Sequence, residues 1–274
     1  MDKIKVMSVF GTRPEAIKMA PLVKALDKEP KTESIVCVTA QHREMLDQVL
    51  EDFKIVPDYD LNIMKAGQTL EDITVRALTG IGEVIREVKP DIVLVHGDTS
   101  TTFAASLASY YNQTKVGHVE AGLRTYDKYQ PFPEEMNRRL TGAIADLHFS
   151  PTKMAKENLL KENIDENGIF ITGNTAIDAL KTTIDDSYVF TVDELNKIDF
   201  KNKRVITITA HRRENLGEPL KNICRAFRRI ADDYEDVEMV YAVHKNPAVS
   251  NTVHEILGGH ERIHLLDPLD LRDM

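Results

Sequence analysis

The sequence has few cysteines and no long apolar run, and both absences limit where the protein can work. Only two of its 274 residues are cysteines. Cys37 lies in an apparent strand and Cys224 in an apparent helix, so both look like small core residues rather than parts of a disulfide framework. The N-terminal stretch leads straight into a strand, and no run is apolar enough for a signal peptide or a membrane span. We expect a cytoplasmic protein without a membrane partner.

The chain also lacks a surplus of positive charge. Its formal net charge is -9, with 42% hydrophobic and 29% charged residues, a composition typical of globular proteins. Binding to nucleic acid or to an anionic membrane surface requires a basic face, so the overall charge argues against both partners. An anionic substrate would need a local cluster of cationic side chains. The length favours two domains.

Several common catalytic motifs are missing as well. The sequence contains no GxGxxG, no P-loop lysine pattern and no GxSxG nucleophile elbow. Histidines and cysteines do not occur at metal-ligand spacing, and no short repeat is present. We therefore expect no metal, no dinucleotide and no other cofactor.

Short apolar runs alternate with helical patterns along the whole chain. This alternation predicts an α/β fold with parallel sheets and right-handed crossovers. The first domain should cover residues 1–173 and the second residues 174–274. The second half shows three strand patterns where the first shows about six, so we expect its Rossmann-like sheet to be incomplete in this chain, either truncated or completed by a partner. The predicted strands are residues 4–10, 34–40, 91–95, 116–119, 147–149, 169–172, 205–210, 237–243 and 263–265.

Acidic residues follow two of these buried strands. Asp98 comes just after one and Glu120 just after the next, while Glu134 opens a helical pattern beyond two prolines. The carboxyl ends of adjacent parallel strands border one crevice, where carboxylates raise one another's pKa and suit proton transfer. Taken singly, Asp98 could instead be a helix N-cap before Thr99, and Glu134 an ordinary first-turn residue. Their joint placement favours catalysis.

The turn after the first strand could bind an anion. Thr12 and Glu15 have capping-box spacing, Pro14 falls at the first helical position, and Arg13 and Lys18 add two cations beside a helix N-terminus. A well-capped helix with surface charges explains the same residues about equally well.

Basic residues recur after two later strands. His42 follows the second strand, although a lone histidine there is more often structural. His211, Arg212 and Arg213 follow the first strand of the second half, where they could oppose the first cluster across an anion or simply cover a solvated helix start.

Seven motifs together resemble the non-hydrolysing UDP-N-acetylglucosamine 2-epimerases of bacteria, in the order found in that family and over essentially the whole chain. They are FGTRPEAIKMAPLV from Phe10, VTAQHREMLDQVL from Val38, VHGDTSTT from Val95, GHVEAGLRT from Gly117, PFPEEMNRRLTG from Pro131, FITGNTAIDAL from Phe170 and AHRRENLGEPL from Ala210. The resemblance implies two Rossmann-like domains of the GT-B type. It also implies a homodimer that interconverts UDP-N-acetylglucosamine and UDP-N-acetylmannosamine for cell-surface polysaccharides.

The resemblance also implies roles for individual residues. UDP would be eliminated to give 2-acetamidoglucal, with loss of the proton at C2, and then added back after protonation on the opposite face. The implied acid and base carboxylates are Asp98, Glu120 and Glu134. The positions implied to contact the UDP phosphates or to support catalysis are Arg13, Lys18 and His211.

Two departures from the family pattern bear on these expectations. The UDP-binding segment of the family, a DSGG-type turn followed by glutamates, has no counterpart up to Met274. Some members also bind a second, activating UDP-N-acetylglucosamine; Gln41 and His211 match that site and His42 lies beside it, but Glu44 and Gly67 replace its Gln and Arg. The alternatives to an epimerase are a GT-B glycosyltransferase, a hydrolysing relative and a non-catalytic fragment.

Overall fold

The computed structural model describes residues 3–40, 43–65, 67–185, 187–210, 212, 215–270 and 272–274, with the backbone alone for 43–45. The chain forms two compact units, Met1–Thr182 and Thr183–Met274. Unit 1 extends beyond the boundary expected at residue 173 and includes nearly all of helix α7 (Thr175–Thr183). Each unit is an α/β layer structure with a parallel sheet, as the sequence pattern predicts.

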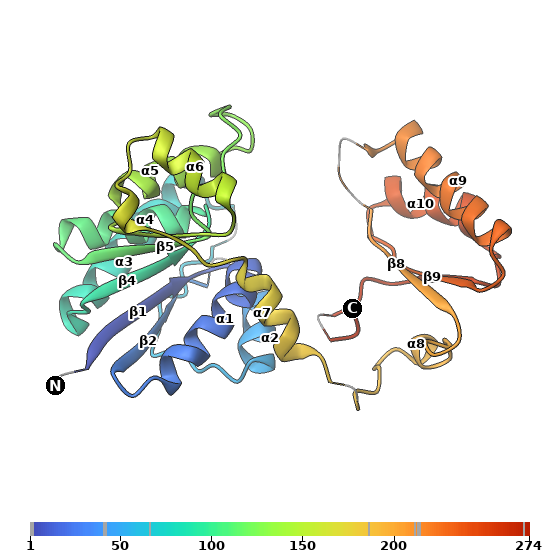
Figure 1. The fold of residues 1–274 in the computed structure, drawn as a ribbon, viewed down its shortest axis with the longest axis horizontal. Helices are drawn as coiled ribbons and strands as arrows, with labels where there is room; N and C mark the ends of the chain where they lie inside the picture. The colour runs from blue at the N-terminus through green and yellow to red at the C-terminus, as the bar shows by residue number, and fades with distance from the viewer. Residues whose placement is uncertain are drawn as a thin grey trace. The chain divides into compact units, whose positions relative to one another are not determined.

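Unit 1 contains a seven-stranded parallel sheet in the order β3-β2-β1-β4-β5-β6-β7. Its strands β2, β1, β4 and β5 are labelled in Figure 1. Its strands are β1 (Ile4–Phe10), β2 (Thr32–Val38), β3 (Tyr59–Asp60), β4 (Ile92–His96), β5 (Lys115–Val119), β6 (Leu147–Ser150) and β7 (Ile169–Ile171). The sequence pattern missed β3, which has only two residues. The strand order reverses between β1 and β4, and a doubly wound sheet opens a ligand crevice at that point, beyond the carboxyl ends of the strands.

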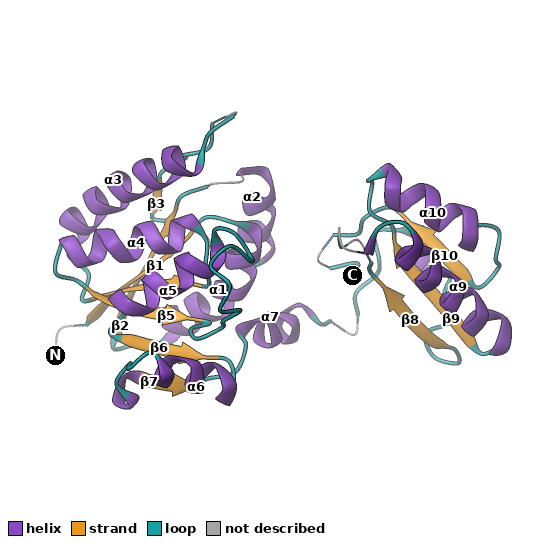
Figure 2. Ribbon diagram, turned by 90° about the horizontal axis from the view of Figure 1, so that it is seen from above, coloured by secondary structure: helices purple, strands orange, loops and turns teal. Residues whose placement is uncertain are grey.

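Helices cover both faces of this sheet (Figure 2). The bounds are α1 (Arg13–Lys28), α2 (Arg43–Asp52), α3 (Leu70–Val88), α4 (Ser100–Tyr111), α5 (Glu134–Ile144), α6 (Lys153–Lys161) and a 3₁₀ turn η1 (Glu166–Gly168). Apolar residues of α1 and α2 pack on one face of β1 and β2, whereas α3 and α4 pack on the other. Strands buried from both sides are mostly apolar, and in β1 the residues Met7, Val9 and Phe10 are fully buried, with one buried serine, Ser8, among them.

Two helix starts position the crevice residues, and each differs slightly from expectation. Thr12 is the N-cap of α1 and forms the predicted capping box with Glu15, but Pro14 is the second helical residue rather than the first. The N-cap of α4 is Thr99, whose hydroxyl accepts a hydrogen bond from Thr102 N. The capping role considered for Asp98 is therefore wrong, and the Asp98 side chain is left for other contacts.

Unit 2 contains three parallel strands in the order β10-β9-β8, in agreement with the three predicted. Its elements are α8 (Asp193–Asn196), β8 (Arg204–Ile208), α9 (Glu218–Asp233), β9 (Val237–Ala242), α10 (Pro247–Leu257) and β10 (Ile263–Leu266). Residues of α9 and α10 form the larger core with one face of the sheet, around Tyr241 and Leu257. Leu195 of α8 and Ile198, which follows that helix, pack with Val240 in a second, smaller cluster.

Both cysteines are free and buried, which confirms their prediction as core residues. Burial raises the pKa of the Cys37 thiol to about 12. Within the described residues, no helix is both long enough and apolar enough to cross a membrane.

Candidate functional site

Asp98 and Glu120 lie at the carboxyl ends of the paired strands β4 and β5. Gly97 lies between the end of β4 and Asp98, and a Cβ atom added to Gly97 would lie 3.9 Å from Glu120 Oε1. The carboxylate of Glu120 is thus directed at the residue before Asp98. The structure brings these two predicted residues to one edge of the sheet.

Glu120 is held in place by contacts from two other elements. Lys18 Nζ of α1 lies 2.6 Å from Glu120 Oε2, and Asn174 Nδ2 donates to the same oxygen at 3.1 Å. The backbone of Glu120 has a φ of 63°, a left-handed conformation that costs a non-glycine residue about 1–2 kcal/mol. Such conformations gather at functional sites, where the surrounding contacts maintain them. Lys18, expected to contact the UDP phosphates or to support catalysis, thus forms an ion pair with a predicted acid or base.

Helix α5 brings the third carboxylate to the same edge of the sheet. Glu134 is its first residue, and its Asn137 donates through Nδ2 to the backbone oxygen of Asp98 at 2.9 Å. Arg138 forms an ion pair with Asp98 Oδ2 through Nη2. The first turns of α5 therefore lie against Asp98, and Glu134 begins that helix.

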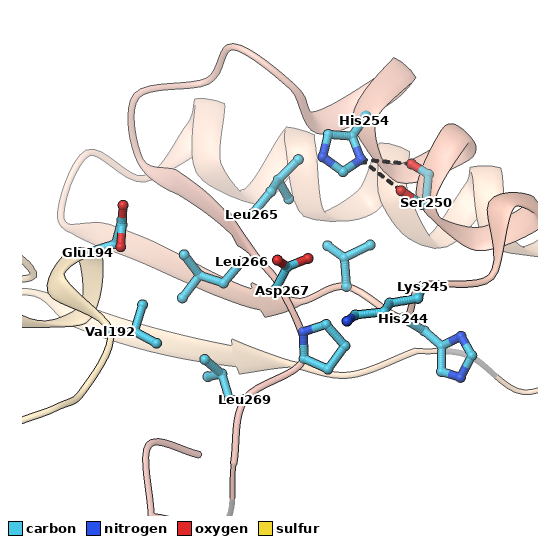
Figure 3. A pocket seen from close by; sticks show the side chains of 12 residues that line it. Val192, Glu194, His244, Lys245, Ser250, His254, Leu265, Leu266, Asp267 and Leu269 are labelled. Atoms are coloured by element: carbon cyan, nitrogen blue, oxygen red, sulfur yellow. Dashed lines mark hydrogen bonds between the residues drawn. The ribbon is translucent and has the colours of Figure 1, made fainter.

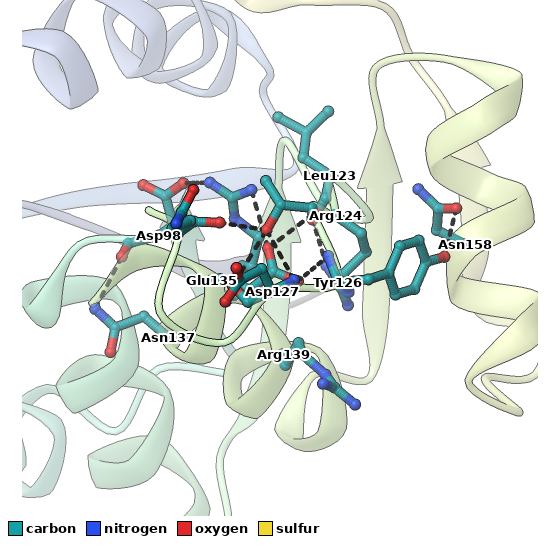
Figure 4. A network of polar contacts seen from close by, with 12 residues as sticks. Asp98, Leu123, Arg124, Tyr126, Asp127, Glu135, Asn137, Arg139 and Asn158 are labelled. Atoms are coloured by element: carbon teal, nitrogen blue, oxygen red, sulfur yellow. Dashed lines mark hydrogen bonds and ion pairs between the residues drawn. The ribbon is translucent and has the colours of Figure 1, made fainter. Parts of the chain in front are cut away.

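Glu135, the neighbour of Glu134, connects this helix to the loop that precedes it (Figure 4). Its side chain is fully buried and accepts hydrogen bonds from Thr125 N and Tyr126 N, both at 3.1 Å. Arg138 Nη1 lies 3.4 Å from Glu135 Oε2. Arg138 thus bridges Glu135 and Asp98. The sequence analysis assigned no role to either residue, because two successive glutamates do not reveal which of them points inward.

Several buried polar atoms on or beside these carboxylates have no hydrogen-bond partner. Among the described residues, those atoms include both ring nitrogens of His96, Glu134 Oε2 and Arg138 Nε. His96 Nε2 lies 3.9 Å from Glu120 Oε2, beyond hydrogen-bond distance. Buried polar groups in folded proteins nearly always have a partner, so these groups are candidates to bind a polar ligand or water.

Histidines from three adjacent strands lie behind the carboxylates. Burial, with a smaller contribution from Lys18, lowers the pKa of His96 to about 3. Burial likewise lowers the pKa of His118 to about 3, and it also lowers the pKa of His148. His118 Nε2 lies 2.7 Å from the carbonyl oxygen of Gly97, so this nitrogen donates and supports the turn before Asp98. All three rings are therefore neutral at physiological pH.

Glu15 binds the start of α1 to the start of α4. Its buried carboxylate accepts hydrogen bonds from Gly11 N at 3.0 Å, Thr12 N at 2.8 Å and Thr99 Oγ1 at 2.7 Å. Burial raises its pKa, although these hydrogen bonds act in the opposite direction. These two amides are therefore occupied by Glu15 and are not available to an anion at this helix start, whereas the side chain of Arg13 forms no ion pair with a described residue.

The remaining predicted residues fall into two groups. Arg13 is the first residue of α1, is partly exposed and forms no ion pair with another described residue. Gln41, His42 and His211 lie outside the described residues, as does the side chain of Glu44. No group of three or more described His, Cys, Asp or Glu side chains could hold a metal ion.

Unit 2 contains a separate cavity of about 740 Å³ beyond the ends of β9 and β10 (Figure 3). Lys245 and His244 follow β9, and Asp267 and Leu269 follow β10. On another side, Ser250 and His254 of α10 lie close together, with His254 Nδ1 2.8 Å from the carbonyl oxygen of Ser250. Carboxyl ends of parallel strands are where open α/β sheets bind ligands.

The sequence model of the UDP-N-acetylglucosamine 2-epimerase family matches residues 24–274. The chain belongs to the UDP-N-acetylglucosamine 2-epimerase family. A UDP-N-acetylglucosamine 2-epimerase of Bacillus subtilis is 60% identical over 274 residues, which are 100% of this chain and 71% of the relative. One of Escherichia coli K12 is 55% identical over 97% of this chain and 72% of the relative. The chain thus spans about 71% of the length of its Bacillus relative.

A solved structure of this epimerase family shares the fold. The UDP-GlcNAc 2-epimerase of Neisseria meningitidis, crystallised with UDP-GlcNAc bound, superimposes with a TM-score of 0.83 at 48% identity, over 98% of this chain and 74% of that one. The family and fold expected from the seven motifs are therefore confirmed. The protein is an enzyme of the UDP-N-acetylglucosamine 2-epimerase family.

Proposed function

We propose that this enzyme inverts C2 of UDP-N-acetylglucosamine by eliminating UDP and adding it back. In the first step the C2 proton passes to a protein base while the bond between C1 and the UDP oxygen breaks, giving 2-acetamidoglucal. In the second step a proton reaches C2 from the opposite face, and the UDP oxygen rejoins C1. The unpartnered buried groups beside Asp98, Glu120 and Glu134 are the observation on which this proposal rests.

Two faces of the sugar require separate proton donors and acceptors. Asp98 and Glu120 project from strand ends, and Glu134 lies on the helix packed against Asp98. This arrangement allows one carboxylate to accept the C2 proton and another to supply it from the other side. The C2 proton is not acidic, so departure of UDP must be assisted electrostatically. We assign this assistance to the side chain of Arg13, together with His211.

Unit 2 would bind the nucleotide in this scheme. Its cavity contains Lys245 and His244 at strand ends and the first turns of α10, whose N-cap Asn246 accepts from Ala248 N at 3.0 Å. The Lys245 ammonium group and a helix start suit a phosphate-bearing ligand, although the carboxylates of Glu194 and Asp267 line the same cavity. A second molecule of substrate as a regulator is not part of the proposal, because Gly67 replaces the arginine of that site.

We further propose that the enzyme forms a homodimer and supplies precursors of cell-surface polysaccharides. Sedimentation velocity tests the dimer.

Proton NMR of UDP-N-acetylglucosamine incubated with the chain in heavy water tests the proposal. We expect the C2 proton to exchange with solvent while the manno isomer appears and no free sugar accumulates. Glu120→Gln and Asp98→Asn should each lower turnover by about 100-fold or more with substrate binding largely retained. Glu166→Gln is the matched control, because Glu166 pairs with Lys156 on the surface. Free N-acetylmannosamine with UDP would indicate a hydrolase, and no exchange at all would refute the proposal for this chain.

A further inference from the structure

Arg138 is the described cation nearest to Asp98, and its side chain is only 12% exposed. Its two terminal nitrogens contact different carboxylates: Nη2 pairs with Asp98 Oδ2, and Nη1 lies 3.4 Å from Glu135 Oε2. A guanidinium group is a planar fork with fixed donor directions, so contacts at both tips determine its orientation. The position of Arg138 is thereby set from the side opposite Asp98.

The anchor of Arg138 is itself rigid. Glu135 is fully buried and takes hydrogen bonds from Thr125 N and Tyr126 N, and Tyr126 OH donates to Asn158 Oδ1 at 2.7 Å. A buried carboxylate is stable only when it is paired or hydrogen-bonded, and Glu135 has both kinds of partner. The chain of contacts from Asn158 to Asp98 is therefore continuous (Figure 4).

The same contacts leave one side of Asp98 free. Arg138 occupies Oδ2, and Asn137 Nδ2 binds the backbone oxygen of the same residue. Oδ1 has no hydrogen bond to any described residue, and the Asp98 side chain is 27% exposed. One oxygen is thus fixed by Arg138, while the other binds no described residue.

We propose that Arg138 is a positioning residue for the epimerisation. Anchored to Glu135 through Nη1, it holds Asp98 Oδ2 through Nη2 and so aligns Asp98 Oδ1 with the reacting sugar. The inference rests on the proposed function, in which Asp98 transfers a proton. Proton transfer needs the carboxylate within hydrogen-bond reach of the proton, and misplacement by about 1 Å can cost on the order of 100-fold in rate. Arg138 acts through Asp98, so the main effect of its loss falls on turnover rather than on substrate binding.

The neighbouring Arg139 provides a matched control. It lies on the same helix, but its side chain is 44% exposed and its Nε lies 3.8 Å from Glu162 Oε1, away from Asp98. Arg138→Gln should lower kcat by about 50-fold to 100-fold with KM within about threefold, and Arg138→Lys should restore part of that loss. Arg139→Gln should keep kcat within about twofold of the parent.

A kinetic cycle with Asp98→Asn distinguishes positioning from general damage to the fold. If Arg138 acts through Asp98, then Arg138→Gln costs less than about threefold in the Asp98→Asn background, although it costs much more in the parent. A variant that is merely less well folded would lose the same factor in both backgrounds, and that result would overturn the proposal. Unchanged kcat in Arg138→Gln would overturn it as well.

A second cycle needs no turnover. The melting temperatures of the parent, Asp98→Asn, Arg138→Gln and the double variant show whether the two side chains interact in the folded chain. We expect the double variant to lose clearly less than the sum of the single losses, because each single change already removes the ion pair between these two partly buried side chains. Strictly additive losses would show that the pair does not exist and would refute the proposal. A parent without epimerase activity, by contrast, would count against the proposed function alone.

Discussion

The three buried histidines behind the site make the fold sensitive to acid. An unfolded histidine titrates near 6.5, whereas His96 and His118 titrate at about 3 in the folded chain. Between these values the unfolded chain binds more protons than the folded chain. These two histidines therefore leave the free energy of unfolding unchanged above about pH 6.5, and they lower it progressively as the pH falls towards 3.

Replacing one of these histidines should reduce that sensitivity. At pH 5 each such histidine costs the folded state about 2 kcal/mol, from 1.36 kcal/mol per pH unit over about 1.5 units. We expect His96→Gln to reduce the drop in unfolding free energy between pH 7 and pH 5 by about that amount, measured by urea unfolding at both values. His254→Gln, at an exposed position, should keep the pH dependence of the parent. Equal slopes for all three proteins would mean that His96 is not neutral in the folded state.

Individual site residues were predictable where a strand end fixes them. Asp98 and Glu120 follow strands whose apolar runs are unmistakable, and adjacent parallel strands place them together. Glu135 and Arg138 were missed, because their inward direction depends on how α5 rotates against β5, which two glutamates and two arginines in a row do not reveal. The sequence also could not show that Lys18 pairs with Glu120, more than a hundred positions away.

At the scale of elements, the turn after β5 depends on one glycine. Gly122 has a φ of 90°, and a Cβ atom there would lie 2.2 Å from the carbonyl oxygen of Ala155. Backbone atoms cannot move aside as a flexible side chain can. The turn follows Glu120 and leads into the loop that Glu135 binds, so its geometry is coupled to the site.

Gly122→Ala should therefore destabilise unit 1 strongly. We expect a loss of at least about 3 kcal/mol, since the left-handed backbone costs about 1–2 kcal/mol and the clash adds to it. The matched control is Gly259→Ala: Gly259 has a φ of 75°, but no heavy atom lies within 4 Å of the added Cβ. Its loss should stay near 1 kcal/mol. Urea unfolding of both variants measures the difference, and similar losses would show that the contact with Ala155 is readily relieved.

Element boundaries were predictable in proportion to their length and capping. The capping box of α1 and the buried run of β1 are local features, and both appear in the structure. The two residues of β3 and the short α8 carry too little periodicity to detect, and tertiary contacts define them. Thr99 rather than Asp98 caps α4. The sequence could not distinguish them, because both residue types cap helices and the backbone conformation decides which one does.

At the scale of the whole molecule, each unit has cores of its own. Unit 1 contains two large clusters, one on either face of its sheet. The main cluster of unit 2 contains fewer residues and lies on one face of three strands. Smaller units bury a smaller fraction of the surface that their unfolded chains expose and are correspondingly less stable. The two units should therefore unfold at different denaturant concentrations.

Hydrogen exchange in increasing urea, read by mass spectrometry of peptides, resolves the two transitions. We expect amides of β8, β9 and β10 to lose protection at lower urea than those of β1, β4 and β5. Leu257→Ala removes a fully buried side chain from the unit 2 core and should cost about 3 kcal/mol there. Its transition should move to lower urea while that of unit 1 stays in place, because Leu257 belongs to no unit 1 cluster. One shared transition, shifted as a whole by Leu257→Ala, would instead mean that the two cores unfold as a single cooperative unit.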